Sequence, residues 1–338
     1  MSQAPPTNIP LWLVRDKPPG GITAGIRTQL GPLAEIVDDP RVTDVFLTGS
    51  GVVFVDTGEG SYPVSGVGIA NAPATDLARG LIEAGGRHVD EANPLVDVHL
   101  GGGLRVHVAL SPISTRGPEI SIRIQRHQKP QLDQLSLEFP DVVIPRLIHV
   151  VETKQTLLIS GATGSGKTTL LGALMAYAAS TERLVVLEDL AELMIDHPHV
   201  VSLECRQANM EGKGEVTLTR LVREALRMKP SRLIVGECRG GEIGDLVQAF
   251  HTGHRGGATT VHAHSVGEVP LRLDSLAALA GIDSKHFARH AVGAFDLIVH
   301  LERVGSQSRR ISFGHLRRTT EGELDVVVEE IPAKPAST

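Results

Sequence analysis

The second half of the chain alternates short apolar runs with amphipathic stretches. The apolar runs have strand length, and the stretches between them carry apolar residues at helical spacing, so the pattern predicts strands and helices in turn. Such alternation is typical of a largely parallel sheet with helices on its faces. The expected strands cover residues 155–160, 184–188, 200–204, 232–235 and 258–262, the expected helices cover 167–179, 217–228 and 242–251, and three more strands are expected within 296–330.

The first half of the chain has a different pattern, which predicts a small α+β unit. Two pairs of apolar runs, 44–48 with 52–55 and 95–100 with 104–110, flank glycine-containing turns and predict β-hairpins. A further strand is expected at 119–124, and helices are expected at 26–37 and 75–84.

These patterns divide the chain into four segments. Two of them are rich in proline and lack a period, so we interpret them as an arm and a linker. The expected segments are a flexible arm at 1–20, an α+β N-terminal domain at 21–127, a linker at 128–140 and a larger α/β domain at 141–338.

Composition narrows the range of functions. The chain has 338 residues, which suits about two domains at roughly 150 residues each. Lys plus Arg is 33, Asp plus Glu is 39, and the net charge is therefore −6, while aromatic residues make up 3%. Proteins that coat nucleic acid need a basic face, and stacking on single strands needs aromatic side chains. We therefore expect no nucleic-acid partner.

Other features of the composition bear on location. No apolar run approaches the ~18 residues that a membrane span requires. The first residues lack the apolar core of a secretory signal. Cys205 and Cys238 are too few for a disulfide framework. These observations predict a cytoplasmic protein without an integral membrane segment.

The strongest motif is a glycine-rich loop after the strand expected at 155–160. Residues 161–168 match G-x-x-x-x-G-K-[ST] at every fixed position. Glycines let the backbone wrap around phosphates, and loop N–H groups bind negative charge. The lysine supplies charge to the β and γ phosphates, and the threonine hydroxyl binds Mg²⁺. The predicted nucleotide-binding residues are Gly161, Ala162, Thr163, Gly164, Ser165, Gly166, Lys167, Thr168 and Thr169, with Thr168 also as a Mg²⁺ ligand.

Two glutamates follow apolar strands of the same half. Glu188 ends the strand at 184–188, and Glu237 follows Gly236 at the end of the strand at 232–235. Ligands of open α/β sheets bind beyond the carboxyl ends of strands. A phosphate loop needs a carboxylate there to order Mg²⁺ or the attacking water. Glu188 is thus a candidate Mg²⁺ ligand, directly or through water; the alternative for both residues is a solvated acid at a strand end.

Four histidines fall between residues 251 and 264. His251, His254, His262 and His264 could supply zinc ligands, although the glycines between them are unlike a zinc motif. His262 ends a predicted strand, where it could instead sense or polarise the γ-phosphate. A histidine satisfied within the core is the third possibility.

Four blocks within residues 155–275 together resemble the secretion superfamily ATPases of type II secretion, type IV secretion and type IV pili. They are the Walker A loop, an acidic box at 188–193, Gly236-Glu237 with the following residues to Glu242, and a histidine box at 252–263. The segment 225–242 looks most like the tight-adherence pilus branch. In the first half, residues 87–97, 104–107 and 117–123 follow the N-domain pattern of that branch.

The resemblance implies a fold and a site. The fold is a RecA-like P-loop NTPase C-terminal domain with a smaller α+β N-terminal domain. ATP would lie between the two domains, and the implied cofactors are ATP and Mg²⁺. Glu237 would support hydrolysis, Glu188 and Glu192 would act in the acidic box, and His262 would read the nucleotide state.

The resemblance also assigns arginines of the first half. Arg105 and Arg123 match arginines that the family turns toward the γ-phosphate, where they neutralise charge on the transferred group. As plain sequence, each could equally form a surface ion pair. Arg206, Arg227 and Arg239 lie in family-like segments, and no role is assigned to them.

The function implied is a Mg²⁺-dependent ATPase motor. It would form a homohexameric ring at the inner face of the cytoplasmic membrane, act on an inner-membrane platform protein, and power tight-adherence pilus assembly or type II/IV secretion. Three alternatives share the phosphate loop: a RecA-type nucleic-acid translocase, a nucleotide-gated adaptor that does not hydrolyse ATP, and a small-molecule kinase. Charge and aromatic content disfavour the first, the acidic and histidine residues disfavour the second, and the lack of a lid-like insertion disfavours the third.

Overall fold

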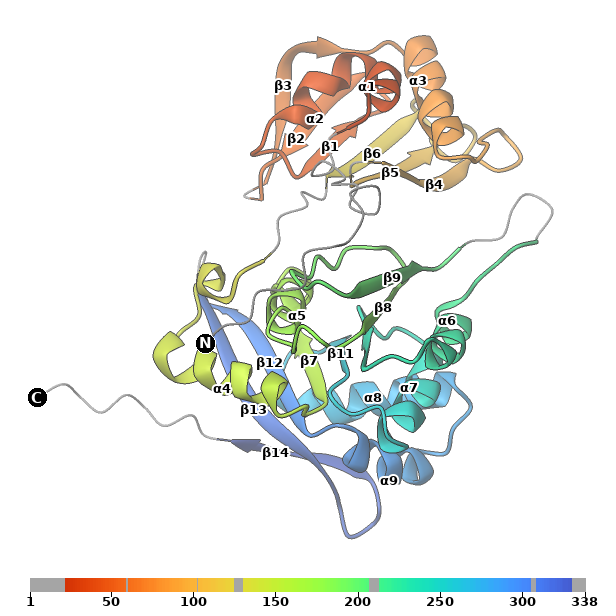
Figure 1. Cartoon of the computed structure of the whole chain (residues 1–338). Helices are drawn as coiled ribbons and strands as arrows, with labels where there is room; N and C mark the ends of the chain where they lie inside the picture. Colours follow the sequence, from red (N-terminus) through yellow and green to blue (C-terminus); the bar gives the residue numbers. More distant parts are fainter. Residues whose placement is uncertain are drawn as a thin grey trace, which may run out of the picture. The chain divides into compact units, whose positions relative to one another are not determined.

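The computed structural model describes residues 22–58, 60–101, 103–124, 130–206, 213–304 and 308–329 (Figure 1). It divides the chain between residues 127 and 128 into two compact units, each with its own sheet and hydrophobic core. The arm expected at 1–20 lies outside the described residues. No helix within those ranges is both long and apolar enough to span a bilayer.

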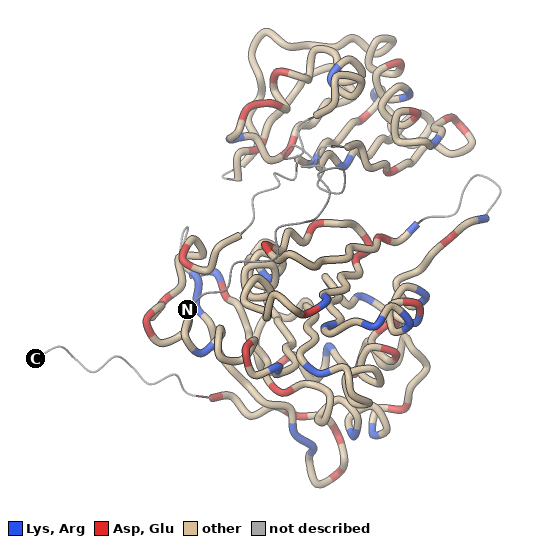
Figure 2. Tube along the Cα trace, in the orientation of Figure 1, with Lys and Arg blue, Asp and Glu red and all other residues tan. Residues whose placement is uncertain are grey.

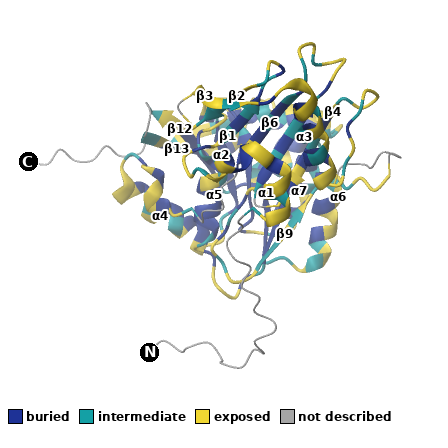
Figure 3. Ribbon diagram, turned by 90° about the horizontal axis from the view of Figure 1, so that it is seen from above, coloured by how far each residue is buried: buried dark blue, intermediate teal, exposed yellow. Residues whose placement is uncertain are grey.

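The first unit is an antiparallel sheet whose buried side packs against helices. Its strand order is β3-β2-β1-β6-β5-β4. The helices turn buried residues toward the sheet and exposed residues outward (Figure 3). The elements are α1 (Ala24–Leu30), α2 (Ala34–Asp38), β1 (Asp44–Leu47), β2 (Val52–Asp56), β3 (Ser61–Gly68), α3 (Asn71–Ala84), β4 (Leu95–Leu100), β5 (Leu104–Ala109) and β6 (Glu119–Ile124).

The second unit is a mainly parallel sheet covered on both faces. Its order is β14-β13-β12-β7-β11-β10-β8-β9, parallel from β12 to β9 and antiparallel over β12, β13 and β14. The elements are α4 (Pro140–Glu152), β7 (Leu157–Gly161), α5 (Lys167–Met175), β8 (Leu184–Glu188), β9 (Val200–Glu204), α6 (Leu218–Ala225), β10 (Arg232–Val235), α7 (Glu242–His251), β11 (Ala258–His262), α8 (Val269–Leu279), α9 (Ser284–Ala294), β12 (Leu297–Val304), β13 (Ser308–Arg318) and β14 (Leu324–Glu329).

Strand β8 shows why this sheet needs helices on both sides. Leu184 and Val186 belong to the core cluster that includes α4 and α5, whereas Val185 and Leu187 belong to the cluster of α6, α7, α8 and α9. Successive side chains of a strand point to opposite faces, so a strand that is apolar at every position must be covered twice. The predicted parallel α/β architecture is confirmed, and the carboxyl ends of β7, β8, β10 and β11 share one edge.

Some local predictions were wrong. The single helix expected at 26–37 is broken into α1 and α2, because Gly31 takes a φ of +52° and Pro32 follows it. Helix α5 ends at Met175 rather than at 179. Helix α4 was not predicted, although its buried Val143 and Leu147 pack in the second core despite a proline within the helix.

Residues 130–138 form part of the second unit. This stretch, expected to lie in the linker, contains a short 3₁₀ helix at Leu132–Leu135. Leu132, Leu135 and Leu137 are buried in the core cluster that includes α5. Pro130 also reaches α5, since a Cβ built on Gly172 would lie 3.2 Å from Pro130 Cγ. The chain is therefore anchored against α5 from Pro130 onward.

Candidate phosphate-binding site

The glycine-rich loop runs from the end of β7 to the start of α5. Gly161, Gly164 and Gly166 have φ values of +156°, +73° and +101°, which residues other than glycine rarely adopt. A Cβ built on Gly161 would lie 2.6 Å from Ser165 Oγ and would also strike the carbonyl oxygen of Leu301. The loop can therefore close only with glycine at its first position.

Lys167 turns its ammonium group back into this loop. Its Nζ donates hydrogen bonds to the carbonyl oxygens of Gly161 and Ala162, both at 2.9 Å, and the residue is only 9% exposed. Burial lowers its pKa, the charge of Glu237 raises it, and Arg239 lowers it further. A partly desolvated cation at the start of a helix is a strong attractor for phosphate oxygens.

The loop offers polar groups that fit a bound phosphate. Ser165 is 2% exposed, and its Oγ has no hydrogen-bond partner among the residues that the structure describes. Thr168 lies in the first turn of α5 and is partly exposed, and Thr169 beside it is exposed. A buried hydroxyl without a partner, a buried ammonium and a helix N-terminus together match the polyphosphate and Mg²⁺ of a nucleotide.

Glu188 ends β8 and is almost completely buried. It is 4% exposed, and its Oε1 accepts hydrogen bonds from the backbone N–H groups of Glu192 and Leu193 at 3.0 and 2.9 Å. Burial raises its pKa from 4.5 to about 7, although the two N–H groups act in the opposite direction. The acidic box is thus a tight turn folded around one carboxylate, with Glu192 exposed at its rim.

Glu237 follows the end of β10 beside two charged neighbours. Its Oε2 lies 2.8 Å from Arg239 Nη2, and its charge acts on Lys167. The loop after Glu237 is held by the buried Glu242, whose Oε1 accepts from the backbone N–H groups of Arg239 and Gly240 at 2.6 and 2.8 Å. Arg239, which had no role from sequence, is therefore the ion-pair partner of Glu237.

His262 ends β11 next to the phosphate loop. It stands opposite Gly161 in the strand register, and its Nδ1 lies 3.5 Å from Thr163 Oγ1. Burial and then the charge of Lys167 lower its pKa, which favours the neutral ring. The ring packs edge-on against His264. The N–H group of a neutral imidazole at this position can donate a hydrogen bond to a phosphate oxygen.

The zinc alternative gains no support. His262 and His264 pack together, whereas the ring of His251 packs edge-on against His290 of α9. His254 Nδ1 lies 3.3 Å from the carbonyl oxygen of Ala249. Within the described ranges, no group of three or more His, Cys, Asp and Glu could hold a metal ion.

The two cysteines lie beside this site as free thiols. Cys238 is fully buried, and its Sγ lies 3.3 Å from Thr259 Oγ1. Cys205 follows β9, and its backbone N–H donates to the carbonyl oxygen of Glu188 at 3.0 Å. Burial, assisted by a hydrogen bond with Asp189, raises the pKa of Cys205 to about 12, and burial raises that of Cys238 as well.

Arg105 and Arg123 lie in the first unit, on the exposed side of its sheet. They are register partners on β5 and β6. Arg105 Nε lies 3.3 Å from Asp97 Oδ1, and Arg123 Nε lies 3.1 Å from Asp44 Oδ1. These arginines are therefore neighbours held in exposed ion pairs. Acidic and basic residues are likewise interspersed along both units (Figure 2).

The other arginines singled out from the sequence have local partners. Arg227 pairs with Glu224 at 3.1 Å on the surface, and Arg206 forms an isolated bridge with Val216 through backbone hydrogen bonds. The sequence did not point to Arg309 of β13, which contacts the phosphate loop: its Nε donates to the carbonyl oxygen of Ser165 at 3.0 Å. No motif signals this contact, because 144 residues separate its partners.

One family model and several known proteins match most of the chain. The family model described as "Type II/IV secretion system protein" matches residues 27–313. A Mycobacterium tuberculosis (strain H37Rv) protein provisionally named for conjugal transfer is 39% identical over 89% of this chain and 88% of its own. The conjugal transfer protein TrbB of Rhizobium radiobacter is 33% identical over 82% of this chain and 84% of its own.

A solved structure has the same fold. The Legionella pneumophila ATPase DotB superposes with a TM-score of 0.57 at 20% identity, covering 93% of this chain and 82% of that one. The predicted fold class, a RecA-like α/β C-terminal unit with a smaller α+β N-terminal unit, is therefore confirmed.

Proposed function

Because this chain belongs to the type II/IV secretion system protein family, we propose that it is a Mg²⁺-dependent ATPase motor. One observation carries the proposal: Lys167 is buried inside the glycine-rich loop, close enough to Glu237 and His262 for their charges to interact. The charge of Glu237 raises the pKa of Lys167, and both charges act on the pKa of His262. A phosphate attractor, a carboxylate and an imidazole at one sheet edge are the parts that phosphoryl transfer to water requires.

Each residue of the site has a separate role in this proposal. The loop 161–166 and Lys167 bind the β and γ phosphates. Thr168 and Glu188 hold Mg²⁺, Glu188 directly or through water, and the metal ion neutralises charge on the phosphates when bound. Glu237 orients the attacking water, and His262 reads the γ-phosphate through its ring. Glu192 completes the acidic box at its exposed rim.

The assembled form is part of the proposal. Six copies form a ring in which ATP lies between the two units, and Arg105 and Arg123 leave their exposed ion pairs to neutralise the γ-phosphate. Motion of one unit against the other then works an inner-membrane platform protein from the cytoplasmic side. Each nucleotide biases that motion by its different affinity for the two arrangements.

Two machines are candidates for this motor. The motifs at 87–97, 104–107 and 225–242 favour assembly of a tight-adherence pilus. The names of the relatives at 39% and 33% identity favour a conjugal transfer apparatus instead. Deleting the gene and scoring pili and DNA transfer in the same strain separates the two: loss of pili with normal transfer supports the first.

The ATPase proposal is tested with three substitutions. Lys167→Ala removes the phosphate attractor, so fluorescent ADP should bind at least about ten-fold more weakly. Glu237→Gln keeps the loop intact, so binding should persist while phosphate release slows about a hundred-fold. Lys285→Ala, which removes an exposed lysine of α9, is the control and should behave as the parent chain.

Other results would point elsewhere. Unchanged turnover in Glu237→Gln would contradict the role given to Glu237. Nucleotide binding without any turnover would favour the adaptor. Turnover that requires DNA or RNA would favour the translocase.

A further inference from the structure

Arg309 joins two parts of the second unit that are distant in sequence. Its Nε donates to the carbonyl oxygen of Ser165 in the phosphate loop at 3.0 Å. Its Nη1 donates to the carbonyl oxygen of Leu135 at 2.9 Å. The guanidinium is a rigid planar fork, so two carbonyl groups bound to its different nitrogens are fixed relative to each other.

The contact with the loop is close and specific. A Cβ built on Gly166 would lie 3.1 Å from Arg309 Nε, so the side chain lies directly against the last glycine before Lys167. The hydrogen bond uses the carbonyl group of Ser165, whose buried hydroxyl has no partner in the described part of the chain. Arg309 therefore fixes the loop through the carbonyl group of Ser165 and leaves the hydroxyl group of Ser165 available.

The contact with residues 130–138 is equally tight. Arg309 N–H donates to the carbonyl oxygen of Ser136 at 3.0 Å, and Glu138 N–H donates to that of Arg309 at 2.8 Å. Leu135 and Leu137 are buried beneath this pairing, and Pro130 packs against α5. Arg309 thus fixes the stretch that leads from the first unit to β13 by both backbone and side-chain bonds.

We propose that Arg309 is a positioning residue for the phosphate loop, and that through it residues 130–138 set the loop for nucleotide binding. A displacement of that stretch moves Leu135, and the guanidinium carries the movement to Ser165. This inference rests on the proposed ATPase function. Arg309 acts through the backbone of the loop and not by contact with the nucleotide.

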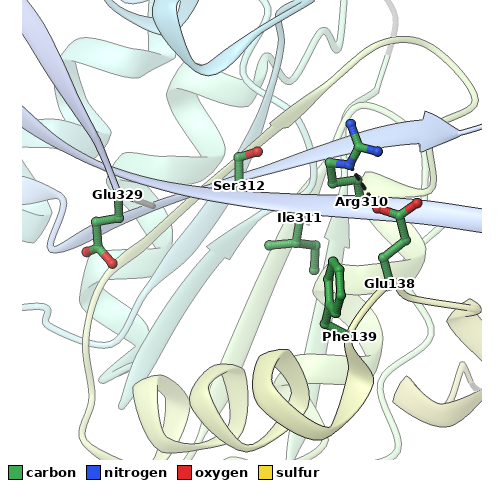
Figure 4. Close-up of a pocket in the computed structure, with 6 residues that line it drawn as sticks. All are labelled: Glu138, Phe139, Arg310, Ile311, Ser312 and Glu329. Carbon is green, nitrogen blue, oxygen red and sulfur yellow. Dashed lines mark hydrogen bonds and ion pairs between the residues drawn. The ribbon is translucent and has the colours of Figure 1, made fainter. Parts of the chain in front are cut away.

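The neighbouring arginine supplies a matched control. Arg310 follows Arg309 on β13, but successive side chains of a strand point to opposite faces. Arg310 Nε lies 2.8 Å from Glu138 Oε2, at a surface pocket of about 240 Å³ lined also by Phe139, Ile311, Ser312 and Glu329 (Figure 4). Its removal deletes the same charge and the exposed ion pair with Glu138, but it leaves in place both bonds of Arg309, to Ser165 and to Leu135.

The experiment compares Arg309→Ala, Arg309→Lys and Arg310→Ala in the full chain. Dissociation constants for fluorescent ADP and for ATPγS, together with KM and kcat for ATP, are the first measurements. Losing a charge-assisted bond to the loop should raise the dissociation constants and KM about ten-fold in Arg309→Ala, with a smaller change in kcat. Arg310→Ala should match the parent chain, and Arg309→Lys, whose single ammonium cannot bridge both carbonyl groups, should lie between.

Hydrogen exchange supplies a readout that general destabilisation would not reproduce. In Arg309→Ala, amide exchange should speed up both in the loop 162–166 and in residues 132–138, while β10 exchanges as in the parent chain. An unchanged dissociation constant in Arg309→Ala overturns the proposal. So does an equal loss in Arg310→Ala.

If Arg309→Ala does not fold, Arg309→Lys decides alone: parental affinity and parental loop exchange overturn the proposal. Failure of the parent chain to bind any nucleotide would refute the ATPase function itself. The two failures are therefore distinguishable.

Discussion

Gly236 lies so close to Glu188 that a Cβ at position 236 would stand 2.8 Å from Glu188 Cγ and 3.0 Å from its Oε1. Glu188 ends β8, and Gly236 directly follows the adjacent parallel strand β10. The carbonyl oxygen of Gly236 accepts a hydrogen bond from Thr260 Oγ1 at 2.8 Å. The space for the buried carboxyl is thus created by the missing side chain of its neighbour.

The first prediction concerns this contact. Gly236→Ala should push the Glu188 side chain from its place and destabilise the protein by about 1–3 kcal/mol, as overpacked cores do. Turnover should fall as well, since the acidic box is folded around that carboxyl. Chemical denaturation and phosphate release measure both effects. Gly267→Ala adds a methyl group at an exposed glycine, where the Cβ would only touch Ser265 Oγ at 3.8 Å, and should change stability by less than about 0.5 kcal/mol.

The second prediction concerns pH. The pKa of Glu188 rises from 4.5 to about 7 on folding, so between these values the folded state keeps a proton that the unfolded state loses. The contribution of Glu188 to stability therefore decreases as pH rises from 4.5 to 7 and is constant above 7. Glu188→Gln removes this dependence.

Denaturation curves at several pH values check the effect. Relative to the parent chain, Glu188→Gln should gain stability between pH 5 and 7.5, on the order of 2 kcal/mol. Glu192→Gln changes an exposed glutamate of the same box and is the control. A stability difference between Glu188→Gln and the parent that stays constant with pH would contradict the prediction.

The third prediction concerns a buried ion pair at the start of β10. Arg232 is 1% exposed, donates to both oxygens of the buried Glu182, and binds the carbonyl oxygens of Val151 and Gly256 at 2.8 and 3.2 Å. Arg232→Met leaves Glu182 paired with the exposed Lys154 at 3.1 Å. The free energy of unfolding should fall by about 3–5 kcal/mol.

The control for this third prediction is an exposed pair. Arg255 Nη2 lies 2.9 Å from Asp296 Oδ1, with 67% of the arginine side chain exposed. Arg255→Ala should cost at most about 1 kcal/mol. Comparable losses in the two variants would show that burial does not govern the strength of these pairs.

The fourth prediction concerns assembly. If subunits complete each other's sites, ATP turnover per chain should rise with protein concentration and then level off once rings are formed. Arg105→Ala and Arg123→Ala should lower the plateau about a hundred-fold. Arg79→Ala, an exposed arginine on α3 of the same unit, should not change it. A rate per chain that is already constant where sedimentation shows monomers would rule out shared sites.

Local signals explain what could be predicted from sequence. The loop at 161–168 and the glutamates after β8 and β10 are adjacent to apolar strands, so their place follows from a motif and from parallel topology. Helix α4 was missed because Pro140 and Pro145 signal a break. The first stands at the helix start, where proline fits, and the buried Leu147 and Val151 hold the remainder in place.

Non-local contacts explain what could not. In the sequence, Arg309 is one of several charged residues on β13. Its role depends on Ser165 and Leu135, each more than a hundred residues away. The burial of Glu188 likewise depends on Gly236, on a strand that is adjacent in space but distant in sequence. Spacing along the chain carries no information about either contact.

The two cysteines determine how the proposed motion can be measured. Cys238 is sealed in the core and Cys205 has a pKa of about 12, so neither forms the thiolate that maleimide dyes attack near neutral pH. Arg79→Cys and Lys285→Cys would therefore place one fluorophore on each unit while the native cysteines stay in place. Energy transfer between the dyes would then test whether the two units move relative to each other when ATP is added.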